Sequence, residues 1–286
     1  MSVKKYLSKI EDFKGRTVIL TGGTSGIGNA LLYHLVSKHA KVVLLVRNLD
    51  KANEEILKLK ETYPEAELST HYYDQSSFAS IEETANYILK EYSNFHSLVL
   101  NAGVLIGKKG GTTVDGYPYS MGVNYYGVKH FIETLLPHLK GEHKIVIQGS
   151  IVAVKGVKKS LDINNPRNGV FTQYNTSKTY LEANFYYWNT STPENIQFVL
   201  TEPGISSTRI TRHFNGLIRF LGKYFLILFF HSPKKASLTL LTGVSDLSKK
   251  GDYIVPRGLF TMSGYPKIKS FPKRRERQYL INKYDK

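Results

Sequence analysis

The stretch TVILTGGTSGIG, Thr17–Gly28, decides the fold class. Its first five residues are apolar or β-branched, which favours a short buried strand. Glycines follow at once and mark a tight turn, and beyond them Ile27, Leu31 and Leu35 recur at helical spacing. The stretch therefore predicts a strand, a glycine-rich turn and a helix.

The same alternation continues along the chain. The runs that predict strands are Thr17–Thr21, Lys41–Val46, Leu68–Tyr73, Leu98–Leu100, Lys144–Gln148 and Ile196–Thr201. The segments that predict helices are Ile27–Leu35, Lys51–Tyr63, Phe78–Tyr92, Gly122–Leu139, Tyr174–Thr190 and Pro233–Leu247. Nearly continuous apolar strands fit a sheet covered on both faces, and crossovers of this length suit parallel neighbours. We predict an α/β protein: a single Rossmann-like domain with a doubly wound parallel sheet of about seven strands and helices on both faces.

The composition fits one globular domain. Of the 286 residues 41% are apolar and 22% charged, and no linker or low-complexity tract divides the chain. We expect the domain to cover residues 1–266. The last twenty residues, 267–286, carry eight Lys or Arg against two acids, so they predict a basic C-terminal tail.

Charge and residue usage exclude several kinds of site. The formal net charge is +16, but no nucleic-acid motif accompanies it or the basic run Lys273–Arg277, so we expect no nucleic-acid partner. The absence of cysteine excludes disulfides, thiolate metal sites and cysteine nucleophiles. The nine histidines show no metal-ligand spacing, so we expect no metal.

No targeting segment is predicted. Met1–Gly15 lacks the apolar run of a signal peptide. Leu217–Phe230 is apolar but shorter than a membrane span of about 20 residues, and Arg219 and Lys223 interrupt it. We therefore expect a cytoplasmic protein. An amphipathic helix at 217–230 could be a lid over an apolar pocket, a dimer contact or a peripheral contact with an anionic membrane surface.

The glycine-rich turn suits a phosphate ligand. Glycines let the backbone approach a pyrophosphate, and the helix that starts there directs unpaired N–H groups and its positive dipole end at the anion. The alternative is a turn that only packs a strand on a helix. Because the loop follows the first strand and opens a helix, the sequence favours dinucleotide binding.

Further motifs follow the glycine loop in a fixed order. The loop itself has the pattern T-G-x-x-x-G-x-G. The other motifs, in chain order, are Asp74, Asn101, Ala102 and Gly103, Asn124, Ser150, Tyr174-x-x-x-Lys178, Pro203 and Gly204, and Thr208. On these residues the chain resembles the short-chain dehydrogenase/reductase family over nearly its whole length. The resemblance implies a nicotinamide dinucleotide, hydride transfer and, because family members are often dimers or tetramers, a homo-oligomer.

Tyr174 and Lys178 lie four residues apart and so share a helix face. A phenol with an ordinary pKa near 10 is a poor acid or base at neutral pH, and a neighbouring ammonium is expected to lower that pKa. The resemblance implies that Tyr174 is the general acid/base, that Lys178 tunes it and holds the nicotinamide ribose, and that Ser150 binds the reacting oxygen. It also implies that Asn124 anchors a water that relays protons to Lys178.

The resemblance also implies the cofactor-binding residues. These are Gly22, Thr24, Ser25, Gly26, Ile27, Gly28, Arg47, Asp74, Asn101, Ala102, Gly103, Tyr174, Lys178, Pro203, Gly204 and Thr208. Asp74 would contact the adenine amino group. Arg47 ends the second strand, where an acid would bind a ribose 2′-hydroxyl and a cation accommodates a 2′-phosphate. We therefore predict NADP(H) over NAD(H), the alternative being that Arg47 only points to water.

One branch of the family is favoured. Ser150 and Tyr174 are 24 residues apart, and the extra stretch Val157–Thr172 resembles an insertion of the branch that holds retinol dehydrogenases, the WW-domain oxidoreductase and light-dependent protochlorophyllide reductases. The strings Val46–Lys51 and Thr113–Tyr117 support this branch. We expect insertions at 151–171 and 205–232, and whether the first borders the substrate or is only a surface loop stays open.

Together these features predict an oxidoreductase. The expected reaction transfers a hydride between NADP(H) and a carbonyl or alcohol group of a small, mostly apolar substrate. The rival hypothesis is a non-catalytic dinucleotide sensor or interaction protein on the same fold.

Overall fold

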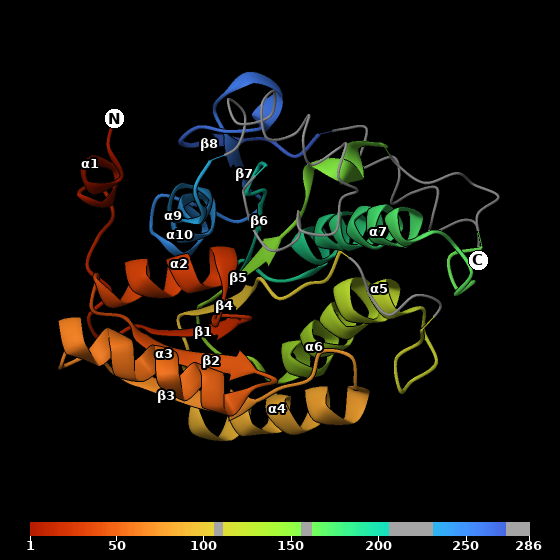
Figure 1. Cartoon of the computed structure of the whole chain (residues 1–286), viewed down its shortest axis with the longest axis horizontal. Helices are drawn as coiled ribbons and strands as arrows, with labels where there is room; N and C mark the ends of the chain where they lie inside the picture. The colour runs from red at the N-terminus through yellow and green to blue at the C-terminus, as the bar shows by residue number, and fades with distance from the viewer. Residues whose placement is uncertain (106–110, 156–161, 206–230, 273–286) are drawn as a thin grey trace.

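The computed structural model describes residues 1–105, 111–155, 162–205 and 231–272, and these form a doubly wound α/β domain (Figure 1). Within them one sheet of eight strands has the order β3-β2-β1-β4-β5-β6-β7-β8. The strands are β1 Thr17–Thr21, β2 Lys41–Val46, β3 Leu68–Tyr72, β4 Ser97–Leu100, β5 His143–Gln148, β6 Ile196–Thr201, β7 Tyr253–Pro256 and β8 Pro266–Lys269. Strands β1 to β7 are parallel, and β8 pairs with β7 antiparallel.

Helices cover both faces of the sheet. Among the described residues the helices are α1 Val3–Leu7, α2 Gly26–Val36, α3 Leu49–Thr62, α4 Phe78–Glu91, α5 Tyr119–Met121, a π-helix Gly122–Tyr126, α6 Gly127–Leu135, α7 Val170–Ser191, α9 Pro233–Ala236 and α10 Leu238–Val244. Short 3₁₀ helices span Leu136–His138, Ile151–Lys155 and Leu259–Thr261. One core packs α2, α3 and α10 on the sheet, and the other packs α4, α6 and α7 on the opposite face.

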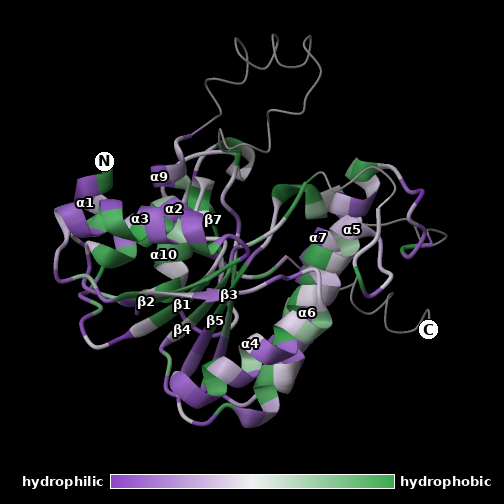
Figure 2. Cartoon of the chain, turned by 60° about the horizontal axis from the view of Figure 1, so that its bottom comes forward, coloured by the Kyte–Doolittle hydropathy of each residue, from purple (hydrophilic) through white to green (hydrophobic). Residues whose placement is uncertain are grey.

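The sequence explains where the helices begin and which of their faces are buried. Asn48 caps α3 by accepting a hydrogen bond from the backbone N–H of Lys51 at 2.8 Å, so the helix begins at Leu49, shortly after β2 ends at Val46. On α2, Leu31 and Leu35 are fully buried, as their spacing predicts. The central strands are largely hydrophobic, whereas α4 turns hydrophilic residues outward (Figure 2).

The predicted α/β class and parallel sheet are confirmed, with corrections in detail. The seventh parallel strand is β7, and an antiparallel eighth strand, β8, lies at the edge. The predicted boundary between residues 266 and 267 falls inside β8. The helix predicted over Gly122–Leu139 is divided among the π-helix, α6 and a 3₁₀ turn.

The sheet topology fixes where a ligand can bind. From β1 the chain moves to β2 and β3 on one side, and then crosses to β4 on the other. Such a switch point opens a crevice at the carboxyl ends of the strands, which is where this class of sheet binds ligands. The ends of β1, β2, β4, β5 and β6 all meet there.

Several sequence predictions lie outside the described residues: Thr208, the apolar segment 217–230, the first part of the insertion at 157–161 and the basic run from 273 onward. Within the described ranges, no helix combines the length and apolarity needed to cross a membrane. The same ranges hold no group of three His, Cys, Asp or Glu residues arranged to bind a metal ion.

Candidate active site

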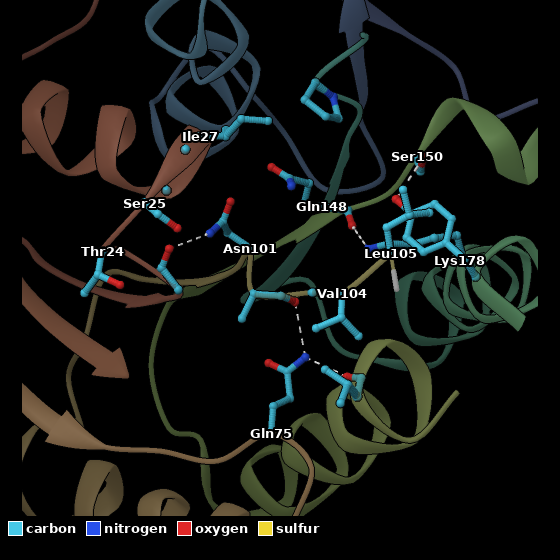
Figure 3. Close-up of a pocket in the computed structure, with 18 of the residues that line it drawn as sticks. Thr24, Ser25, Ile27, Gln75, Asn101, Val104, Leu105, Gln148, Ser150 and Lys178 are labelled. Atoms are coloured by element: carbon cyan, nitrogen blue, oxygen red, sulfur yellow. Dashed lines mark hydrogen bonds between the residues drawn. The ribbon is translucent and has the colours of Figure 1, made fainter. Parts of the chain in front are cut away.

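A cavity of about 720 Å³ occupies the crevice at the carboxyl ends of the strands (Figure 3). It runs from the glycine loop after β1 to Tyr174 and Lys178 on α7. The predicted site residues that line it are Gly22, Thr24, Ser25, Gly26, Ile27, Gly28, Arg47, Asp74, Asn101, Ala102, Gly103, Ser150, Tyr174, Lys178, Pro203 and Gly204. Motifs spread from Gly22 to Gly204 thus meet in one place.

The glycine loop is shaped by close backbone contacts. Gly22 has φ +71°, a conformation that side chains rarely adopt. A Cβ at Gly28 would overlap the carbonyl oxygen of Gly22, so the loop folds this tightly onto α2 only with glycine there. The Asn101 amide donates to the carbonyl oxygens of Thr21 at 2.9 Å and Gly22 at 3.1 Å, which fixes the loop to the end of β4.

The ligand that this end of the cavity fits is an anion. Helix α2 begins at Gly26, in the cavity wall, where its first N–H groups have no partner within the helix. At the other end, Gln148 Oε1 is buried without a hydrogen-bond partner among the described residues, and Gln148 lines the cavity. A phosphate site at one end and an unpaired polar atom at the other suit an extended dinucleotide.

Ser150, Tyr174 and Lys178 come together at the inner end of the cavity. The Tyr174 hydroxyl donates to Ser150 Oγ at 3.4 Å. Lys178 is buried, and its ammonium donates to the carbonyl oxygen of Gln148 at 2.8 Å. A Cβ added to Gly103 would lie 3.8 Å from Lys178 Nζ, so the backbone after β4 passes close to this ammonium.

Burial is the main cause of the pKa shifts of Tyr174 and Lys178. It raises the pKa of Tyr174, a rise that the hydrogen bond with Ser150 opposes and Glu182 increases. The expected lowering of the phenol pKa is therefore wrong, because burial disfavours the phenolate. Burial also lowers the pKa of Lys178 to about 8, against the opposing charge of Glu182. At neutral pH Tyr174 thus holds a proton that it can donate.

Asn124 lies in the π-helix, behind the wall of the cavity. Its fully buried amide accepts from the N–H of Val104 at 2.8 Å and donates to the carbonyl oxygen of Val104 at 2.7 Å. It also donates to Ser177 Oγ at 3.2 Å, on α7. Asn124 therefore joins the loop after β4 to the helix that carries Tyr174 and Lys178. The implied role in a water relay stays a prediction.

The opposite end of the cavity carries basic and acidic groups. Arg47 is exposed at the rim and donates to the Tyr119 hydroxyl at 3.1 Å. Asp74 accepts hydrogen bonds from the N–H and hydroxyl of Ser76 at 2.9 and 2.7 Å. Lys51 also lines the cavity but was not among the predicted site residues. Its place four residues after Arg47, in the first turn of α3, is the signal that could have identified it.

Gln75 is a second residue that the sequence did not single out. Its buried amide donates to the carbonyl oxygen of Val123 at 2.7 Å, in the π-helix, and to that of Ala102 at 3.2 Å (Figure 3). Gln75 directly follows Asp74, so its hydrogen bond to Val123 joins the Asp74 end of the cavity to the backbone beside Asn124. No local pattern predicts these contacts, because both partners are distant in sequence.

Replacing Gln75 by leucine is expected to destabilise the domain. The change leaves the carbonyl oxygens of Ala102 and Val123 without their donor, and each buried polar group left unpaired costs about 1–3 kcal/mol. Urea unfolding measures the loss. The matched control is Gln197→Leu, at a partly exposed position of β6, which should change the free energy of unfolding by less than about 0.5 kcal/mol. Equal stability of Gln75→Leu and the wild type would contradict the prediction.

The described part of the insertion packs beside the cavity. Ile163 packs against the core, and the Tyr126 hydroxyl donates to Asn164 Oδ1 at 2.8 Å. The amide of Gln173 holds the segment to the start of α7 through the carbonyl oxygens of Pro166 and Asn168, at 3.0 and 2.8 Å. Phe171, just beyond, lines the cavity. The insertion therefore places the side chain of Phe171 in the wall of the cavity.

The sequence of this chain matches a known protein family. A family model described as short chain dehydrogenase matches residues 16–216. The chain belongs to the short-chain dehydrogenase family, a family of oxidoreductases. The resemblance inferred from the motifs is thereby confirmed.

The individual proteins that resemble this chain share only about a third of its residues or fewer over the matched part. The short-chain dehydrogenase/reductase pkfC of Emericella nidulans is 28% identical over 88% of this chain and 86% of its own length. Mouse retinol dehydrogenase 13 is 28% identical over 78% of this chain and 69% of its own. A short-chain dehydrogenase/reductase of Armillaria gallica is 36% identical, but over 48% of this chain and only 44% of its own length. The chain thus spans less than half of that relative.

Solved structures support the fold. A crystal structure of an uncharacterized protein from Mycobacterium paratuberculosis has a TM-score of 0.73 at 19% identity, covering 98% of this chain and 94% of that one. A short chain dehydrogenase from Burkholderia cenocepacia in complex with NADP has a TM-score of 0.64 at 17% identity, covering 82% and 92%. At these identities the likeness concerns the fold alone.

Proposed function

We propose that this protein is an NADP(H)-dependent oxidoreductase that interconverts a carbonyl and an alcohol group on a small, mostly apolar substrate. The observation that carries the proposal is the meeting of Ser150, Tyr174 and Lys178 in the cavity that begins at the glycine loop. Fold alone would not support a reaction, but these three groups form an acid–base site beside a phosphate cradle.

The residues toward the glycine loop would hold the dinucleotide. Gly22–Gly28 and the start of α2 would bind the pyrophosphate, and Asp74 would contact the adenine amino group. Lys178 would donate to the nicotinamide ribose. When bound, the nicotinamide supplies or accepts the hydride, and the protein's own groups handle the proton.

Proton transfer would fall to Tyr174. Its hydroxyl lies 3.4 Å from Ser150 Oγ, so one substrate oxygen placed between them would receive hydrogen bonds from both. Because burial raises the pKa of Tyr174, this residue is protonated at neutral pH and suited to donate to a carbonyl oxygen. Asn124 would keep the loop after β4 and α7 in register through Val104 and Ser177.

The lining beside these groups favours an apolar substrate. Val104, Leu105, Val152, Phe171 and Ile205 all line the cavity. Ser150 and Tyr174 provide the polar groups that would orient a carbonyl, in the usual manner of a binding site with few polar contacts. The test is oxidation of NADPH, followed by absorbance at 340 nm, over a panel of apolar aldehydes and ketones. Absence of turnover with every member, while NADPH still binds, would favour the non-catalytic sensor instead.

Arg47 supports the preference for NADP(H). We expect Arg47→Asp to weaken NADPH binding by about 10- to 100-fold, since lost charge-assisted hydrogen bonds cost about 1.5–3 kcal/mol. NADH affinity should hold or rise, because an aspartate can accept from the ribose 2′-hydroxyl. Fluorescence titration with both cofactors measures the change.

The control for this change is Lys9→Asp, which alters the net charge equally at an exposed position outside the cavity lining. Its affinities should match those of the wild type. A wild-type protein that binds NADH more tightly than NADPH would contradict the proposed preference.

We also propose, from the family resemblance, that the protein is a homo-oligomer. Light scattering coupled to size-exclusion chromatography tests this. A monomer at micromolar concentration would contradict it.

A further inference from the structure

Helix α7 carries an acidic side chain, Glu182, besides the two ionisable groups of the proposed acid–base site. Tyr174, Lys178 and Glu182 follow one another at intervals of four residues and so lie along one face of the helix. Glu182 is only 1% exposed. A carboxylate so deeply buried is costly unless charge or hydrogen bonds compensate it, so its place on this face calls for a reason.

The contacts of Glu182 lead to the serine of the site. Its Oε1 accepts a hydrogen bond from the backbone N–H of Ser150 at 3.1 Å. A Cβ built on Gly149 would lie 2.6 Å from the same oxygen, so the carboxylate packs directly on the backbone that leaves β5. The segment that presents Ser150 to Tyr174 therefore rests on Glu182.

The charge of Glu182 acts on both neighbours along the helix. It raises the pKa of Lys178, which burial lowers to about 8, and it adds to the raised pKa of Tyr174. Among the described residues, Glu182 is the charged group whose effect on both of these pKa values is resolved. Glu202, which directly follows β6, is also a buried carboxylate.

We propose that Glu182 is a positioning residue of the active site, which fixes the backbone of Ser150 and supplies the negative charge that keeps the buried Lys178 protonated. The proposal rests on the proposed function, because it assigns Glu182 its role through Ser150 and Lys178. A protonated Lys178 can donate to the ribose, whereas a neutral one loses the charge that makes this contact strong.

Glu182→Gln separates the charge from the hydrogen bond. Glutamine keeps an oxygen that can accept from the Ser150 N–H but has no charge. Without the carboxylate the pKa of Lys178 falls below about 8, so Lys178 loses its proton at a lower pH. We expect the pH at which NADPH affinity begins to decline to move down by about one unit, the low end of the roughly 1–3 units by which an opposite charge at close range shifts a pKa.

The experiment measures NADPH binding by fluorescence titration between pH 6 and pH 9, and carbonyl reduction over the same range. At pH 6, where Lys178 is protonated in both proteins, the affinity of Glu182→Gln should lie within about twofold of the wild type. Removing the carboxylate lowers the pKa of both Lys178 and Tyr174, so the alkaline limb of the reduction profile moves in the same direction as the binding profile.

Two further variants complete the test. Glu182→Leu removes the acceptor as well as the charge, so it should lower kcat at pH 6, where Glu182→Gln does not. Glu194→Gln changes an exposed carboxylate paired with Lys250 and should leave both pH profiles unchanged. Thermal unfolding of each variant verifies that the protein is folded at the assay temperature.

The outcomes distinguish this inference from the proposed function. Superimposable pH profiles for the wild type and Glu182→Gln, in a protein that binds NADPH and turns over, would overturn the role of Glu182 alone. A wild type that binds NADPH but reduces no carbonyl compound would overturn the proposed reaction. In that case a shifted binding profile for Glu182→Gln would still support the link between Glu182 and Lys178.

Discussion

Replacing Tyr174 by phenylalanine is expected to lower kcat for carbonyl reduction by about 10²- to 10⁴-fold, the range over which a positioned general acid contributes to a rate. The change removes only the hydroxyl, which donates to Ser150 Oγ at 3.4 Å. The ring stays in place, so the dissociation constant for NADPH should change by less than about threefold. Single-turnover measurements of NADPH oxidation report the loss, and fluorescence titration reports the binding.

The matched control is Tyr187→Phe, on the same helix but 41% exposed and outside the lining of the cavity. Its turnover should equal that of the wild type. If Tyr174→Phe kept more than a tenth of the wild-type kcat, Tyr174 would not be the proton donor. If NADPH binding fell in parallel with kcat, the effect would be one of cofactor binding rather than of proton transfer.

Replacing Gly28 by alanine is expected to lower kcat/KM for NADPH by at least about 100-fold. A Cβ there overlaps the carbonyl oxygen of Gly22, a backbone atom that can move only if the loop opens. Inserting a methyl group into such a contact costs about 1–3 kcal/mol, and a shift of about 1 Å in a bound group can cost about 10²-fold in rate. Steady-state kinetics at varied NADPH measures this effect.

Gly169→Ala is the control for Gly28→Ala. The position has an ordinary φ of −56°, and a Cβ there would meet its nearest atom, Thr172 Oγ1, at 3.9 Å. This variant should keep wild-type kinetics. If Gly28→Ala retained both the stability and the NADPH affinity of the wild type, the glycine loop would not be the phosphate site.

Much of the fold follows from local pattern. Runs such as Thr17–Thr21 and Lys41–Val46 form strands at the predicted residues because they are buried on both faces of the sheet. The edge of the sheet was harder to predict. Strand β8, Pro266–Lys269, offers a single apolar side chain between lysines and resembles the basic tail that follows it. It is a strand because β7 supplies hydrogen-bonding partners, which no local pattern reveals.

The residues of the site also fall into those that local pattern predicts and those that it does not. Motif residues such as Ser150, Tyr174 and Lys178 meet where their places at the ends of strands and on one helix face predict. Gln75 and Glu182 hydrogen-bond to backbone groups far along the chain, and no local pattern predicts those contacts. The direction of the pKa shift of Tyr174 was also missed, because it depends on burial, which the i, i+4 pairing with Lys178 does not express.

The strand order also determines how the chain assembles during synthesis. Strand β1 is made first but lies in the interior of the sheet, with β2 on one side and β4 on the other. The edge of β1 where Val18 pairs with Ser97 of β4 therefore stays unpaired until β4 has been made. Until then we expect the nascent chain to expose an apolar strand with an unpaired edge, which is a template for aggregation. The glycine loop is made together with β1 but can receive the hydrogen bonds of Asn101 only once β4 lies beside β1, so we expect the ligand site to form only after that pairing.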